Sequence, residues 1–440
     1  MKPTLVVLLL CLACGSATPA TTSTTTTASP TTEPTAPAPT RPSVSRPLDP
    51  RERAALDRLI GATELARDLR FVRHVDAFVQ SPDAIAAHAD TQLDDEDLAE
   101  AGLLYRGLGM IPPDLDLRAH LRELLGEQVL GYFDPEEDRL VLRDEVVHIL
   151  STRPGSPSAL DARLVVVHEL THALQAHHLR LRELHDVERS SDADVAFHAL
   201  VEGDAMLSML VDLSVEMNVP LENLVTDAAI DQLASGAAGG GNDSLLAAPP
   251  IVRVSLVAPY VAGLRFVRAL HASGGWRKID DAFARLPASM EQVLHPERYL
   301  QGEAPEPLTL PEFPAFAAAG FERVDEDTLG ELELSVFFAR GTGEDTNAAA
   351  AAGWAGDLLR LYRAGDRPAI VWVIRFDDPR EATEAESALR RVADPNDRFH
   401  RVNRSLLVCR HVPEAAEAEV LTWFRTEAAG PTVTRAPTAR

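Results

Sequence analysis

Leu164-Val-Val-Val-His-Glu-Leu-Thr-His172 is the stretch of sequence that decides the fold. Its last five residues have the pattern HExxH, and the apolar run before them predicts a helix that is buried in the core. On a helix, His168 and His172 lie one turn apart on the same face, which is the separation that two imidazoles need to bind one zinc ion. Glu169 flanks that face, where its carboxylate can take a proton from water.

The start of this helix has a signal of its own. Ser158-Ala-Leu-Asp161 has the spacing of a capping box, in which side chains satisfy the first backbone N–H groups of a helix. The alternative to a metal site is a solvated helix with incidental histidines. A capped helix that carries the motif favours the metal site.

A catalytic zinc site needs a third protein ligand, and Glu202 is the preferred candidate. It lies thirty residues after His172, on a long helix predicted over about 192–217. Such a second helix, packed against the first, can deliver one carboxylate to the metal. Gly203 and Ala205 would allow a close approach of helices at that point. The alternative for Glu202 is a solvated helix charge.

His178 is the competing third ligand. Its spacing from His172 is that of the third histidine in HExxHxxGxxH, but Gln175 stands where that pattern has glycine. Glycine ends the helix and turns the chain back to the metal, whereas glutamine continues the helix and carries His178 away.

Two acidic side chains are candidates for the outer shell of the site. Asp204, or Asp194 on the same predicted helix, could accept the second N–H of a ligand imidazole and fix its tautomer. Their alternative is a solvated helix charge. His198, one turn before Glu202, is expected to be a packed or solvated histidine and not a ligand.

Four motifs in chain order carry a family resemblance, and they are Gly131-Tyr-Phe-Asp-Pro135, His168-Glu-Leu-Thr-His-Ala-Leu-Gln175, Leu200-Val-Glu-Gly-Asp-Ala205 and Ser289-Met-Glu-Gln-Val-Leu-His-Pro-Glu-Arg-Tyr299. Over roughly residues 65–300 the chain resembles a family of bacterial and archaeal zinc metallopeptidases of the gluzincin type. The resemblance implies a zincin fold with one Zn²⁺ per chain. It also implies His168, His172 and Glu202 as ligands and Glu169 as base. Met290 stands where that family has threonine.

Substrate binding and oxyanion stabilisation have weaker signals. Residues 128–142 predict a β-hairpin, and in zincins an edge strand binds the substrate backbone antiparallel. His295 or Tyr299 could stabilise the oxyanion. Their alternative is structural, with His295 ending a helix and Tyr299 packed below it. The helix that begins near Pro259 is expected to be structural.

The fold class is therefore predicted as α+β, a mostly helical zincin-like domain followed by a smaller α+β domain. The predicted parts are a signal peptide (1–14), a tether rich in Thr, Pro and Ser (15–48), the metallopeptidase domain (49–303), a Pro-rich linker (304–329), an accessory domain (330–430) and a disordered tail (431–440). In the accessory domain we expect strands at 331–338, 369–376 and 405–408 and helices at 379–392 and 414–424. The stretch 234–250 is predicted to be a loop.

The first residues predict export. Leu12-Ala13-Cys14-Gly15 follows a short apolar run and is similar to the lipobox of bacterial lipoproteins, so that Cys14 is expected to be lipidated. Ordinary secretion, with cleavage near Ala17 or Ala20, is the alternative. We expect an envelope protein facing the periplasm or the outside, with a lipid anchor as its only membrane contact.

Charge and composition narrow the partners. The 440 residues include 42 Lys and Arg and 67 Asp and Glu, a net charge of −25 that repels nucleic acid. The expected partner is a peptide or protein substrate of a zinc endopeptidase. The alternative function is a non-enzymatic envelope lipoprotein that uses the domain as a binding or structural module.

Overall fold

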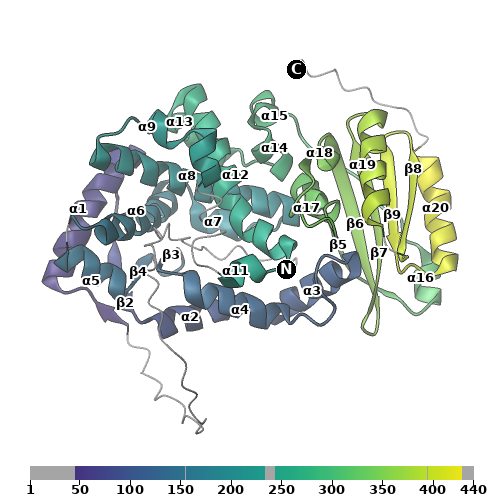
Figure 1. The fold of residues 1–440 in the computed structure, drawn as a ribbon, viewed down its shortest axis with the longest axis horizontal. Helices are drawn as coiled ribbons and strands as arrows, with labels where there is room; N and C mark the ends of the chain where they lie inside the picture. Colours follow the sequence, from purple (N-terminus) through teal and green to yellow (C-terminus); the bar gives the residue numbers. More distant parts are fainter. Residues whose placement is uncertain (1–44, 154, 233–242, 394, 429–440) are drawn as a thin grey trace, which may run out of the picture.

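The computed structural model describes residues 45–153, 155–232, 243–393 and 395–428. Within them the chain has an α+β fold, with a mostly helical main part and a smaller C-terminal part built on a five-stranded sheet (Figure 1). The predicted signal peptide with Cys14, most of the tether, much of the predicted loop 234–250 and the tail from residue 429 lie outside the described residues.

The main part consists of helices and one four-stranded sheet. Its elements are β1 (Arg46–Pro47), α1 (Pro50–Arg67), β2 (Asp76–Gln80), α2 (Pro82–Thr91), α3 (Asp95–Leu108), α4 (Leu117–Gln128), β3 (Gly131–Asp134), β4 (Arg139–Arg143), α5 (Asp144–Thr152), α6 (Pro157–His178), α7 (Leu181–His185), α8 (Ser191–Met217), α9 (Leu221–Leu224), α11 (Asp243–Ala247), α12 (Pro250–Gly274), α13 (Trp276–Ala284), α14 (Met290–Leu294) and α15 (Pro296–Gln301).

The C-terminal part follows α15 after a stretch without helix or strand, residues 302–313. Its elements are α16 (Pro314–Ala318), β5 (Glu322–Asp327), α17 (Gly330–Phe337), α18 (Ala348–Ala351), β6 (Trp354–Ala364), β7 (Arg367–Phe376), α19 (Pro379–Val392), β8 (Asp397–Val402), β9 (Ser405–Arg410) and α20 (Glu414–Ala428). The order of the five strands is β5-β6-β7-β9-β8, and all neighbours are antiparallel.

Helix α6 carries the HExxH motif and begins earlier than predicted. Ser156 is its N-cap and accepts a hydrogen bond from the Ala159 amide, and Pro157 occupies the first helical position. The predicted capping box at Ser158–Asp161 is therefore wrong, because those residues already lie inside the first turns. The helix continues through His178, as expected from the glutamine at position 175.

The predicted hairpin is present, and it forms an edge of the first sheet. Strands β3 and β4 pair antiparallel with Tyr132 opposite Val141, and the sheet order β1-β2-β4-β3 leaves β3 at the edge. Strand β2 pairs parallel with β4 and was missed in the sequence, since most of its residues are only half-buried and lack a clear alternation. The edge strand β3 lies against α6.

Helices α8 and α12 cross with their backbones in contact. A Cβ atom added to Gly203 would lie 2.3 Å from the backbone of Gly263, and one added to Gly263 would lie 2.1 Å from the carbonyl oxygen of Ala199. A close approach of helices at Gly203 is thus present, but the helix in contact with Gly203 is α12 and not the expected HExxH helix α6. In the described part of the chain, α12 is the one helix long and apolar enough to cross a membrane, but most of its apolar window is buried inside the protein, as in a core helix.

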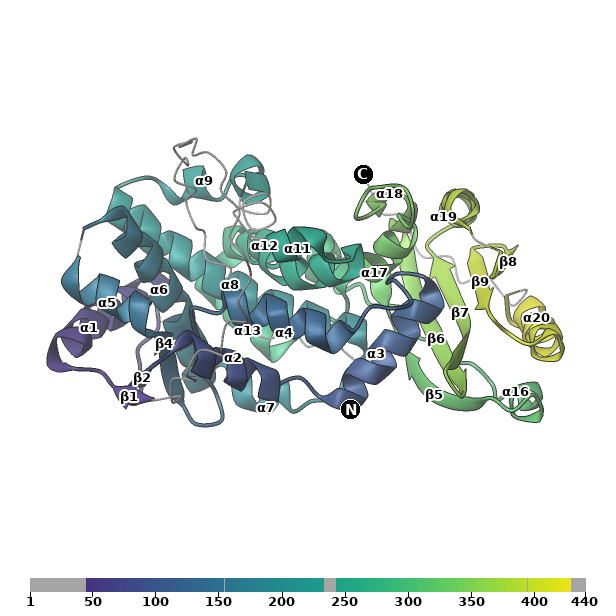
Figure 2. The same cartoon turned by 60° about the horizontal axis from the view of Figure 1, so that its bottom comes forward.

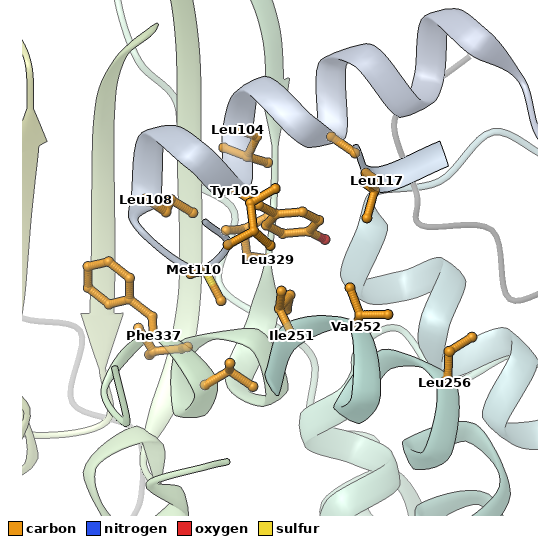
Figure 3. Packing of buried hydrophobic residues seen from close by; sticks show 14 of the residues in the cluster. Leu104, Tyr105, Leu108, Met110, Leu117, Ile251, Val252, Leu256, Leu329 and Phe337 are labelled. Carbon is orange, nitrogen blue, oxygen red and sulfur yellow. The ribbon is translucent and has the colours of Figure 1, made fainter. Parts of the chain in front are cut away.

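The two parts share one hydrophobic core. Helix α3 lies beside the C-terminal sheet in both views (Figures 1 and 2), and its side chains meet those of α12 and α17 in the cluster of Figure 3, which labels Leu104, Tyr105, Leu108, Ile251, Val252 and Phe337.

The C-terminal end of α3 is also held by two arginines and an aspartate of the C-terminal part. Arg410 donates to the Gly107 carbonyl, Arg340 donates to the Leu108 carbonyl, and Asp397 pairs with both guanidinium groups.

Two expectations for the C-terminal part are corrected. Residues 331–338, predicted as a strand from their alternating Glu and Leu, form α17, whose residues are all buried. Asp357 accepts hydrogen bonds from the amides of Leu329 and Gly330 and so caps this helix, an interaction that local alternation does not reveal. The predicted linker 304–329 contains α16 and β5, and β5 pairs with β6 as part of the sheet.

Candidate metal centre

Three buried side chains from two helices converge at one point. His168 and His172 come from α6 and Glu202 from α8, and their ligand atoms all lie within 4.8 Å of one another. The Oε2 atom of Glu202 lies 3.1 Å from Nε2 of His168 and 3.7 Å from Nε2 of His172. All three residues are at most 3% exposed. This group could bind a metal ion.

The two histidines are in the protonation state that a metal ion requires. Burial lowers the pKa of both imidazoles to about 4, so that both are neutral near pH 7, the form that binds metal. Two of the buried atoms, Nε2 of His172 and Oε1 of Glu202, have no hydrogen-bond partner among the described residues. Unpaired buried polar atoms are costly, and a metal ion at this point would satisfy them.

Gln175 sets the tautomer of His172. Its amide nitrogen donates to the carbonyl of Val201 and to Oδ2 of Asp204, both at 2.9 Å. The amide oxygen therefore faces Nδ1 of His172 at 2.8 Å and accepts a hydrogen bond from the N–H at this position. With the proton on Nδ1, the lone pair of Nε2 points at Glu202 and is available to a metal.

The predicted outer-shell residues occupy different places. Asp204 acts through Gln175 and not directly on an imidazole, and its Oδ1 pairs with Nε of buried Arg67 at 2.7 Å. Arg67 also binds Asp280 at 2.6 Å, so that this chain of contacts reaches the partly exposed helix α13. Asp194 pairs instead with His198 and Arg189, both at 3.4 Å.

Glu169, the neighbour of His168 on α6, contacts the edge strand β3. It is fully buried, and its Oε2 accepts a hydrogen bond from the amide of Phe133 on β3 at 2.9 Å. The amide of Phe133 is therefore directed toward α6 and away from β4, the strand that pairs with β3. The base candidate is thus adjacent to the edge strand β3, whose residues Gly131, Tyr132 and Phe133 are buried.

The remaining candidates are engaged elsewhere. His178 is exposed and donates to the carbonyl of Arg70 at 2.6 Å, as expected of a residue carried away by the continuing helix. Nε2 of His295 binds the carboxylate of Glu331 at 3.0 Å. The hydroxyl of Tyr299 donates to the Arg285 carbonyl at 2.7 Å, in agreement with the structural alternative for this residue.

Tyr260 was missed as a site residue. It lies on α12, is 4% exposed, and stacks its ring on that of His168, with centroids 6.2 Å apart and planes at 28°. The sequence offers one signal for it, a polar hydroxyl within a long apolar helix, and that signal does not specify which helix it faces.

Comparison with known proteins adds little to the site. A family model described as a domain of unknown function (DUF8575) matches residues 318–440, which lie in the C-terminal part. No curated protein and no solved structure matches the chain. The metal-binding group lies outside the matched residues.

Proposed function

We propose that this protein is a zinc-dependent endopeptidase. The observation that carries the proposal is the convergence of His168, His172 and Glu202, with Glu169 beside them at a sheet edge. Two imidazoles and one carboxylate form a mixed nitrogen and oxygen set that suits zinc. The described residues offer three candidate ligands, and a catalytic zinc site leaves its fourth position to water or substrate.

The chemistry divides between the metal and the base. A zinc ion at this site would lower the pKa of water and polarise a substrate carbonyl. Glu169 accepts the proton of the attacking water on its carboxylate and then delivers it to the leaving amine nitrogen. Its burial beside the ligands excludes bulk water and strengthens these interactions.

The edge strand β3 is the proposed binding site for the substrate backbone. An extended peptide can add to a sheet edge by main-chain hydrogen bonds, which tolerate many side chains. Because the amide of Phe133 contacts Glu169, a peptide paired with β3 lies next to the base. With the predicted signal peptide and Cys14, the activity belongs to the cell envelope, on a tethered lipoprotein.

A second function is favoured by one observation, the complete burial of the site. Structural zinc sites are closed, so a non-enzymatic lipoprotein with a structural or binding zinc site is the competing candidate. The presence of Glu169 favours the enzyme, since a structural site has no use for a base.

The test is metal content and peptide hydrolysis of the parent, Glu169→Gln and Glu202→Ala. We expect one zinc per parent chain, retained in Glu169→Gln and lost in Glu202→Ala, with hydrolysis abolished in both. Glu216→Ala, an exposed carboxylate on the same helix α8, is the matched control and should keep both properties. Zinc without hydrolysis in the parent would favour the structural site, and zinc binding without Glu202 would contradict the ligand set.

A further inference from the structure

The helix that carries Glu202 begins against the C-terminal part. At the N-terminus of α8, the amide of Ser191 donates to Oδ1 of Asp327 at 3.0 Å, and the Ser191 hydroxyl donates to Oδ2 of the same carboxylate. The next amide, that of Asp192, donates to the Thr328 carbonyl at 3.1 Å. The first amides of a helix have no partner within it. Two of those of α8 are therefore satisfied by the C-terminal part.

The fit at this point is tight. The segment 327–330 joins β5 to α17, and a Cβ atom added to its Gly330 would lie 1.9 Å from Oδ1 of Asp192. The same oxygen accepts a hydrogen bond from the amide of Met290 at 2.9 Å. Gly330 has a φ of 75°, which glycine adopts without steric cost. The segment thus passes the first turn of α8 with no room for a side chain.

Asp357 ties the segment to the C-terminal sheet. This buried carboxylate on β6 accepts hydrogen bonds from the amides of Leu329 and Gly330, at 3.1 and 2.9 Å. It also accepts from the indole N–H groups of Trp354 and Trp372, at 2.9 and 2.7 Å. Hydrogen bonds to a charged acceptor are stronger than those between neutral groups. The start of α8 is therefore connected to the sheet through a fixed segment.

An apolar contact accompanies the polar ones. Helices α14 and α17 both contact α8. Leu332 on α17 belongs to the same hydrophobic cluster as Val195 and Ala199 of α8. Asp327, Gly330 and Leu332 all lie within the residues 318–440 that the family model matches. The matched domain thus contributes both polar and apolar contacts to the helix of the third metal ligand.

The contact between α8 and α12 does not by itself fix α8 along its axis. It lies between small residues, Gly203 and Ala199 on one helix and Gly263 on the other, whose smooth surfaces allow sliding and rotation. Glu202 lies about 15 Å beyond Asp192 along α8, at roughly 1.5 Å per residue. A continuous helix carries a shift or rotation of its first turn over that length. A metal site tolerates a displacement of only about 0.5 Å in its ligands.

We propose that the C-terminal part positions the metal centre, with Asp327 as the residue that fixes α8 and thereby Glu202. The inference rests on the metal site of the proposed function. Asp327 acts through the helix, so it is a positioning residue and not a ligand. The domain of unknown function matched at 318–440 then serves, in this chain, as the support of the metal-binding helix.

The experiment measures the zinc affinity of full-chain variants by competition with a chromophoric chelator. Asp327→Ala removes the acceptor of Ser191 and should lower the affinity about 2–30-fold, the range in which remote residues change ligand binding. Asp327→Asn keeps an acceptor for the Ser191 amide and should keep the affinity of the parent. Leu407→Ala is the control. It removes a buried side chain from a cluster formed by residues of 308–428, so it should destabilise the sheet and leave the affinity unchanged.

The inference fails if zinc affinity does not depend on the contact with Asp327. Parental affinity in Asp327→Ala would show this, and an equal loss in Leu407→Ala would mean that only the stability of the sheet matters. Should Asp327→Ala not fold, Ser191→Ala removes the hydroxyl contact alone, and parental affinity there overturns the inference. Zinc binding does not require hydrolysis, so a zinc-loaded parent that cleaves no peptide refutes the peptidase function alone. A parent that binds no zinc refutes both.

Discussion

The amide oxygen of Gln175 lies 2.8 Å from Nδ1 of His172, and this contact decides which nitrogen of the imidazole faces Glu202. The orientation of the amide is determined by its nitrogen, which has two oxygen acceptors on α8, the Val201 carbonyl and the Asp204 carboxylate. Glutamine stands where a helix-ending glycine would turn the chain, so helix α6 continues through His178, and its amide orients His172 in the group that could bind a metal ion.

Gln175→Leu should weaken zinc binding without removing a ligand. Leucine is close in size to glutamine but cannot accept a hydrogen bond from Nδ1–H of His172. The imidazole can then carry its proton on Nε2, which blocks metal binding there. Loss of such outer-shell partners typically costs about 10–100-fold in affinity. Competition with a chromophoric chelator measures the change. Gln92→Leu, at the exposed end of α2, is the control, and equal affinities for both variants would refute the tautomer role.

Gly263→Ala should destabilise the protein and displace Glu202. The added methyl would lie 2.1 Å from the Ala199 carbonyl oxygen, so α8 and α12 must move apart. Overpacking of this kind costs about 1–3 kcal/mol in the free energy of unfolding, and zinc affinity should fall with it. Urea denaturation measures the first effect. Gly61→Ala is the matched control, because nothing lies within 4 Å of its added methyl, and it should stabilise α1 by up to about 1 kcal/mol.

Sequence reasoning reached the local features of the site and missed the long-range ones. HExxH and the helix of Glu202 are visible because helical spacing places side chains on one face. The contacts of Arg67 and Tyr260 depend on how α1 and α12 pack, which periodicity does not encode. The strand predicted at 331–338 failed for the same reason, because the capping of α17 by Asp357 comes from a strand later in the chain.

Arg67→Met should be strongly destabilising. Arg67 is buried between Asp204 and Asp280, and its guanidinium also stacks over Trp276 at 4.5 Å. Burial raises the pKa of Asp204, and the nearby guanidinium of Arg67 lowers it. Breaking a buried pair by removing one partner costs about 3–5 kcal/mol in the free energy of unfolding. Chemical denaturation measures it, with exposed Arg70→Met as a control that should stay within about 0.5 kcal/mol. Equal effects of the two changes would contradict a structural role of the series of side-chain contacts that runs from Asp280 through Arg67, Asp204 and Gln175 to His172.

Glu333→Gln should stabilise the protein more at pH 8 than at pH 5. Glu333 on α17 accepts a hydrogen bond from the Tyr105 hydroxyl on α3 at 3.0 Å, across the core that joins the two parts. Burial, together with the nearby carboxylates of Asp327 and Asp357, raises its pKa from 4.5 to about 8.

The sign of this effect follows from proton linkage. The folded state binds the Glu333 proton more tightly than the unfolded state, so this group contributes stability that is complete below pH 4.5 and is lost as the pH rises to about 8. Glutamine keeps an acceptor for Tyr105 and has no proton to lose. The gain in the free energy of unfolding from Glu333→Gln should therefore grow between pH 5 and pH 8, by a few kcal/mol at most. Melting temperatures of parent and variant at the two pH values measure it. Exposed Glu344→Gln should show no such trend, and a gain that is constant with pH would mean that Glu333 is already ionised in the folded protein.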